Sequence, residues 1–159
     1  MVIGTSRATP GYLPGPLFPG TWRVLLGLAQ VGHEPCAYRI DVSFDPDAER
    51  DVVPEPWADP ASAWAVLRPA RGWYRGDLHS HTHHSDARGS LDDLLRAAEA
   101  RGLDFLAVTD HNTVSHHGPL AARSTPELVL LPGMEITTYH GHANAHGAGW
   151  IDFRLPKTG

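Results

Sequence analysis

The chain has 159 residues, of which 42% are apolar and 19% charged, a composition typical of one soluble domain or two small ones. Its net charge of -5, with 13 scattered basic residues, disfavours nucleic acid as an obligatory partner, although a small site could accept a phosphate ester. The single cysteine excludes an internal disulfide. No apolar run approaches the length of a membrane span, so we expect a cytoplasmic protein without membrane contact.

The N-terminal part is expected to form a small β module. Residues 1–20 are rich in Pro and Gly and predict an irregular lead-in. Apolar and polar side chains alternate in residues 21–31 and again in residues 36–44, a pattern that predicts an antiparallel hairpin. Residues 45–60 read as a linker or long surface loop. We therefore assign residues 1–70 to this module and its linker.

Strands and helices alternate from Trp73 onward. The predicted strands are residues 74–81, 103–109 and 128–138. Ser90 can cap a helix that ends at Gly102, and a weaker helical segment covers residues 115–123. This order predicts an α/β fold with a parallel sheet over residues 73–159.

Histidine is concentrated in this second part, which contains 10 of the 11 histidines, between His79 and His146. His79 and His81 belong to the stretch GDLHSHTHHSD. Alternate side chains of an extended strand share a face, so these two imidazoles can bind one cation together. Taken singly, the remaining histidines of interest are expected to be solvated or hydrogen-bonded residues without a ligand role; these are His33, His83, His84, His116 and His117.

Further polar residues follow the ends of the predicted strands. Asp86 follows the first strand, Asp110 and His111 the second, and Glu135 lies late in the third. Functional sites of parallel α/β sheets lie at the edge formed by the carboxyl ends of the strands. Imidazole and carboxylate without thiolate suit Zn, Mn or Fe, and Glu135 could bridge two metals that activate water for hydrolysis. Asp110 could be a ligand, but we favour a second role, that of orienting a ligating imidazole.

The motifs DLHSHTHHSD, AVTDHN and PGMEITT together resemble the opening of a PHP domain, the polymerase and histidinol phosphatase superfamily of metal-dependent phosphoesterases. The resemblance covers about residues 73–153. It implies a distorted (β/α)7 barrel, here partial and preceded by the β module, with two or three divalent metal ions. The ligands that it implies first are His79, His81, Asp86, His111 and Glu135.

A later histidine ligand is also implied by the resemblance, and the stretch YHGHANAHG offers His140, His142 and His146. We choose His142, because GHAN after EITT looks like the branch of the superfamily that includes the carbaryl hydrolase CehA. His146 is the main rival.

The chain stops at Gly159, whereas a complete barrel needs 200 or more residues. We therefore expect a fragment, a truncated product or a chain whose missing half comes from elsewhere, with an unpaired sheet edge that favours self-association. The expected function is hydrolysis of a small-molecule phosphate ester by metal-activated water. The alternatives are hydrolysis of a carbamate or carboxylic ester at the same centre, and a non-catalytic metal-binding or interaction module.

Overall fold

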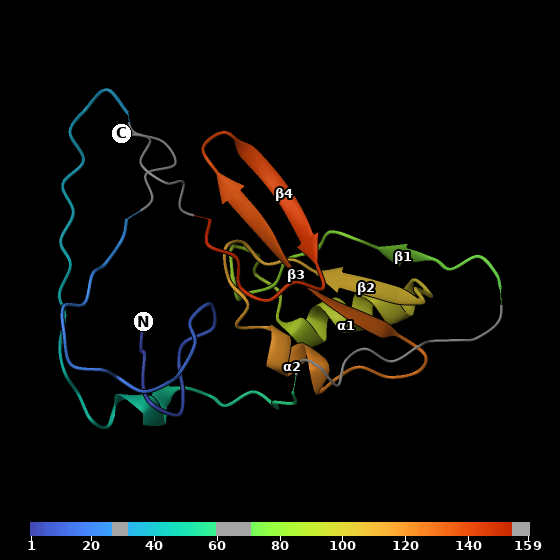
Figure 1. The fold of residues 1–159 in the computed structure, drawn as a ribbon, viewed down its shortest axis with the longest axis horizontal. Helices are drawn as coiled ribbons and strands as arrows, with labels where there is room; N and C mark the ends of the chain where they lie inside the picture. The colour runs from blue at the N-terminus through green and yellow to red at the C-terminus, as the bar shows by residue number, and fades with distance from the viewer. Residues whose placement is uncertain (27–31, 60–70, 154–159) are drawn as a thin grey trace.

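The structure is a computed structural model that describes residues 1–26, 32–59 and 71–153. It is a mixed α/β fold around one four-stranded sheet with the order β1-β2-β3-β4 (Figure 1). The strands are β1 (Gly76–Asp77), β2 (Phe105–Val108), β3 (Val129–Thr138) and β4 (Gly141–His146). The helices are the 3₁₀-helix η1 (Ala48–Asp51) and the α-helices α1 (Leu91–Ala100) and α2 (His117–Ala121). None of the described helices has the length and apolar character needed to span a bilayer.

The parallel part of the sheet was predicted correctly. Strand β1 pairs with β2, and β2 pairs with the first half of β3, both in parallel. Pro132 is the last β3 residue paired with β2, and from Gly133 onward β3 pairs with β4 instead. Since β4 is antiparallel, β3 and β4 form a long hairpin that extends away from the parallel strands (Figure 1). This hairpin was not predicted.

Helix α1 begins and ends as predicted. The Ser90 side chain accepts a hydrogen bond from the Asp93 backbone N–H, and Asp93 accepts one from the Ser90 backbone, which completes a capping box. After the helix, Gly102 has a φ of +63°, a conformation that glycine adopts without strain. The local sequence therefore fixes both ends of α1.

The core lies between the two helices and one face of the sheet. Leu106 and Val108 of β2 and Leu130 of β3 point to this face and pack with apolar residues of α1 and α2. The cluster comprises Leu91, Ala98, Leu106, Val108, Leu120, Leu128 and Leu130. This packing fixes the parallel strands and hence the positions at which the following loops begin.

The predicted N-terminal hairpin is wrong over the described residues. Residues 21–26 and 36–44 contain no strand, and residues 27–31 lie outside the described part of the chain. The apolar side chains that alternate there are exposed, for example Val42 at 83% and Phe44 at 86%. A lone two-stranded hairpin is at best marginally stable, and none of the described residues forms a further layer over these side chains. The boundary near residue 70 stays a prediction.

Other contacts join the N-terminal segment to the rest of the chain. Glu49 accepts hydrogen bonds from the backbone N–H groups of Thr5, Ser6 and Arg7. The Gly11 backbone N–H donates to Ser115 Oγ at 3.0 Å, and Ala58 N–H donates to the Gly118 carbonyl at 3.1 Å. The segment is therefore held on α2 and on the loop before it by polar contacts.

Substitution of Leu130 by Ala is expected to lower the free energy of unfolding by about 2–5 kcal/mol, because the fully buried side chain leaves a cavity in the core. Chemical denaturation measures this change. Leu78→Ala is the matched control, since Leu78 is 52% exposed, and it should cost much less. Equal losses in the two variants would contradict the placement of the core.

Candidate metal centre

The loop after β1 carries the first two predicted ligands. Strand β1 is shorter than predicted, because the chain turns where Asp77 accepts a hydrogen bond from the His79 backbone N–H at 3.0 Å. His79 and His81 therefore lie beyond the strand. Their side chains nevertheless converge as the alternation predicted, with 2.9 Å between the two Nε2 atoms.

Glu135 stands at the middle of the cluster and is only 3% exposed. One carboxylate oxygen lies 3.0 Å from His79 Nε2, 3.1 Å from His81 Nε2 and 3.2 Å from His111 Nδ1. The other oxygen lies 2.8 Å from His142 Nδ1. Four imidazoles from three parts of the chain thus meet on one carboxylate.

Backbone pairing beyond the strand ends sets these positions. His111 forms a parallel bridge with Glu135, and Thr137 pairs with His142 across the β3–β4 hairpin. Neither His140 nor His146 belongs to the groups of candidate ligands found among the described residues. The structure therefore brings His142, rather than its two rivals, to Glu135.

Asp86 lies at the rim, with 71% of its side chain exposed. Its carboxylate is 3.6 Å from His111 Nε2, on the opposite side of that ring from Glu135. His111 stacks on His81, with ring centroids 4.4 Å apart. All six predicted ligands are therefore linked in one cluster: His79, His81, Asp86, His111, Glu135 and His142.

Burial and hydrogen bonding decide the charge states of the central groups. Burial alone would raise the pKa of Glu135, but hydrogen bonds from His79 and His142 and the charge of His111 outweigh it and lower that pKa. Burial lowers the pKa of His81, and the neighbouring His111 lowers it further. The cluster therefore favours an ionised carboxylate and a neutral His81 imidazole.

The spacing of the donor atoms fits a metal ion. Ligand atoms about 2.0–2.1 Å from a tetrahedral zinc ion are about 3.4 Å from one another. The distances from Glu135 and Asp86 oxygens to imidazole nitrogens, 2.8 to 3.6 Å, bracket this value. Neutral imidazole and carboxylate are also the ligand types that Zn, Mn and Fe take.

Asp110 holds the loop after β1 in place, whereas we predicted that it orients a ligating imidazole. It is fully buried and accepts hydrogen bonds from the Thr82 backbone N–H and hydroxyl, both at 2.7 Å, and from the Ser85 hydroxyl at 2.6 Å. Its carboxylate also lies 3.3 Å from His116 Nδ1. Asp110 thus holds the loop between His81 and Asp86, rather than bonding to a ligating ring.

Asn112 and Thr137 also shape the site, although neither was predicted to do so from the sequence. Asn112 has a φ of +52°, which asparagine tolerates better than most residues. Its side chain donates to the Thr137 carbonyl and accepts from the Thr137 backbone N–H. Thr137 Oγ1 lies 2.5 Å from His111 Nδ1. The residue after TDH could have been recognised as a turn former that ties β2 to β3.

The fold and this cluster define an α/β protein segment with a candidate centre for divalent metal ions. Residues 77–155 match the family model described as PHP domain. Part of the chain is also similar to two proteins named 5'-3' exoribonuclease Rnm. The identity is 37% over 84 residues for the Escherichia coli protein and 38% over 85 for that of Salmonella typhimurium. Each alignment covers 50% of this chain and 29% of the relative. The comparisons thus support a PHP domain over this half of the chain.

Buried histidines behind the cluster predict a pH-dependent stability. Burial lowers the pKa values of His116 and His117, which contact the Val108 and Gly133 carbonyls. The unfolded chain protonates them near pH 6.5, whereas the folded protein keeps them neutral at lower pH. Unfolding therefore takes up protons, and the free energy of unfolding should fall as the pH drops from about 7 to 5, by at most about 1.4 kcal/mol per pH unit for each histidine.

The variant His116→Gln tests this cause, because its amide can still donate to the Val108 carbonyl but does not titrate. Denaturation in the presence of chelator should give a shallower pH slope for this variant than for the unaltered chain. His33→Gln, at an exposed position, should leave the slope unchanged. An unchanged slope in His116→Gln would show that His116 does not contribute.

Proposed function

We propose that this chain contributes the metal centre of a hydrolase that cleaves a phosphate ester. The observation that carries the proposal is the buried Glu135 carboxylate with four imidazole nitrogens at 2.8 to 3.2 Å. The match of residues 77–155 to the PHP domain supports it independently. The chain spans 29% of the length of the two relatives, so the activity of a whole protein is part of the proposal.

The residues that would hold two or three metal ions fall into three overlapping groups. One comprises His79, His81 and Glu135. The others are His81, Asp86 and His111, and His111, Glu135 and His142. Of the residues that belong to two groups, Glu135 could bind two neighbouring ions because a carboxylate has two oxygens, whereas each neutral imidazole nitrogen of His81 and His111 would bind one ion. Divalent ions at such a site polarise a phosphoryl oxygen and lower the pKa of water.

The chain's own residues prepare the site in two ways. Glu135 is ionised and nearly inaccessible to solvent, so its negative charge acts on cations at short range with little screening. Thr137, held by Asn112, contacts Nδ1 of His111 and limits rotation of that ring. His79 and His142 expose about half of their side chains, and Asp86 more, so a substrate can reach the cluster from their side.

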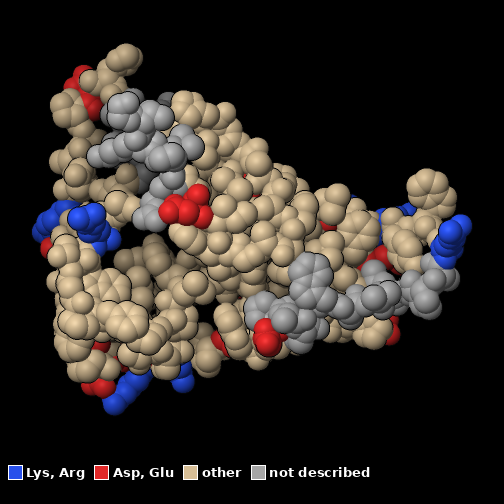
Figure 2. Space-filling view, viewed as in Figure 1, with Lys and Arg blue, Asp and Glu red and all other residues tan. Residues whose placement is uncertain are grey.

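The substrate class has two candidates. A small phosphate ester fits the net charge of -5, and on the face in Figure 2 the basic side chains of the described residues lie towards the edges. A phosphodiester of RNA is the second candidate, favoured by the name 5'-3' exoribonuclease that both relatives bear. Both reactions use the same attack of water on phosphorus. Carbamate or carboxylic ester hydrolysis, and metal binding without catalysis, are the competing outcomes.

Hydrolysis assays with the full chain separate these outcomes. We expect chelator-sensitive release of nitrophenol from bis(4-nitrophenyl) phosphate, restored by Zn²⁺ or Mn²⁺, and little from 4-nitrophenyl acetate. A 5'-phosphorylated RNA oligonucleotide tests the second substrate class in parallel. If the metal-loaded chain cleaves only the carboxylic ester, the phosphoesterase proposal is wrong. If it cleaves none of the three, the chain is a metal-binding module without catalytic activity.

Glu135→Gln should weaken Zn²⁺ or Mn²⁺ binding at this centre at least about tenfold and abolish metal-dependent hydrolysis, because the amide lacks the charge shared by four imidazoles. Calorimetric titration measures the affinity. Glu127→Gln is the matched control at an exposed position and should bind metal as the unaltered chain does. Unchanged affinity in Glu135→Gln would remove Glu135 from the metal centre.

A further inference from the structure

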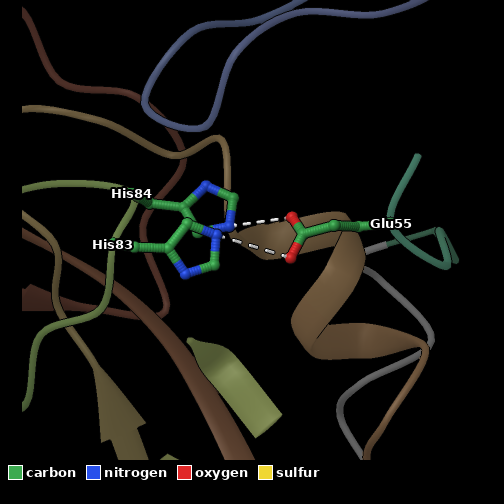
Figure 3. A group of neighbouring side chains, drawn as sticks. All are labelled: Glu55, His83 and His84. Atoms are coloured by element: carbon green, nitrogen blue, oxygen red, sulfur yellow. Dashed lines mark ion pairs between the residues drawn. The ribbon is translucent and has the colours of Figure 1, made fainter. Parts of the chain in front are cut away.

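A second group of histidine and carboxylate side chains lies outside the six residues of the centre at Glu135. It comprises Glu55, which follows η1, and the adjacent His83 and His84 of the loop after β1 (Figure 3). His84 is almost fully buried, with 2% of its side chain exposed, whereas Glu55 and His83 expose 23% and 29%. Two imidazoles and one carboxylate therefore face one another across a long separation in sequence.

This group shares no residue with the centre at Glu135. The three candidate groups around Glu135 are joined through shared residues, whereas Glu55, His83 and His84 belong to none of them. The loop from His79 to Asp86 thus presents its first two histidines to one place and its next two to another. His79 and His81 approach Glu135, while His83 and His84 approach Glu55.

The distances within the group are compatible with a shared ligand set as well as with an ion pair. Glu55 Oε2 lies 2.9 Å from His84 Nε2, and Glu55 Oε1 lies 3.7 Å from His83 Nε2. The buried His84 Nε2 nevertheless lacks a hydrogen bond of good direction to any described group. The two distances bracket the value of about 3.4 Å expected between ligands of tetrahedral zinc.

The other ring nitrogen of His84 is held by a serine. His84 Nδ1 lies 2.8 Å from Ser115 Oγ, which also accepts from the Gly11 backbone N–H. Thr113 Oγ1 contacts both the Gly11 carbonyl and Ser115 Oγ. One hydroxyl proton serves one acceptor at a time, so when Thr113 donates to Gly11, Ser115 can donate to Thr113 and accept from His84 Nδ1–H.

In that arrangement Nε2 of His84 presents a lone pair to the Glu55 carboxylate. Two lone pairs at 2.9 Å repel each other, and a cation between them turns the repulsion into attraction. A hydrogen bond on the opposite ring nitrogen is the usual support of a ligating histidine.

We infer that Glu55, His83 and His84 form a second metal site, for a divalent transition metal ion of the zinc type. Two imidazoles and one carboxylate are a ligand set that leaves a fourth position for water. Glu55 and His84 also line a cavity of about 350 Å³, which provides space for that water beside the ligands. The ion would clamp the N-terminal segment onto the loop that carries Asp86.

The zinc content of the purified full chain tests the inference. It is measured by mass spectrometry after dialysis against zinc and then buffer. Glu55→Gln and His83→Asn should each bind one zinc ion fewer per chain than the unaltered protein. Both positions are partly exposed, so these variants are expected to fold, which circular dichroism checks. His33→Asn and Glu99→Gln, at exposed positions elsewhere, are the matched controls and should keep the full content.

The Glu135→Gln variant separates this site from the proposed function. It should keep the zinc ion of the second site, so the double variant Glu135→Gln, His83→Asn should hold one zinc ion fewer than Glu135→Gln alone, whatever remains at His81, Asp86 and His111. If Glu135→Gln alone loses all zinc, or if Glu55→Gln and His83→Asn keep the full content, the second site does not exist. Glu55 and His84 then form an ordinary hydrogen-bonded pair. Failure of the hydrolysis assays would leave this result unaffected.

Discussion

The architecture of the site depends on the Glu135 carboxylate, which is buried among four imidazoles. Burying an ionised carboxylate costs several kcal/mol unless partners compensate, and here the compensation comes from residues of different elements. His79 and His81 follow β1, His111 follows β2, and His142 lies on β4. The register that pairs Glu135 with His111 and Thr137 with His142 is therefore also the geometry of the site. A slip of one residue in β3 would turn the carboxylate to the opposite face.

A second buried carboxylate, Asp110, organises the loop that serves both clusters. By binding Thr82 and Ser85 it folds this loop back on the end of β2, so that the first two histidines of the loop approach Glu135 and the next two approach Glu55. Asp110 thus positions the histidines indirectly, by fixing the loop that carries them. Glu55, from the N-terminal part, meets this same loop, which explains why an otherwise irregular segment stays close to the sheet.

Much of the PHP-like half was predictable, because its signals are local or follow from parallel pairing. Ser90, Asp93 and Gly102 mark the ends of α1, and the strand-end rule predicted that His111 and Glu135 would meet. The antiparallel β4 was missed because the apolar residues that alternate in GHANAH are only alanines, and the stretch lacks the β-branched and aromatic residues typical of strands. The N-terminal strands were predicted from an alternation that no packing layer supports. Glu55 could not be paired with His83 and His84 because only the three-dimensional fold joins them.

The proposed metal centre has Glu135 as its shared ligand. Anomalous diffraction from crystals of the full chain grown with zinc tests it most directly, since the signal locates the ions without reference to activity. We expect an anomalous peak about 2.0–2.2 Å from a Glu135 oxygen and from imidazole nitrogens of the surrounding histidines. Zinc-containing crystals with no peak within bonding distance of Glu135 would contradict it.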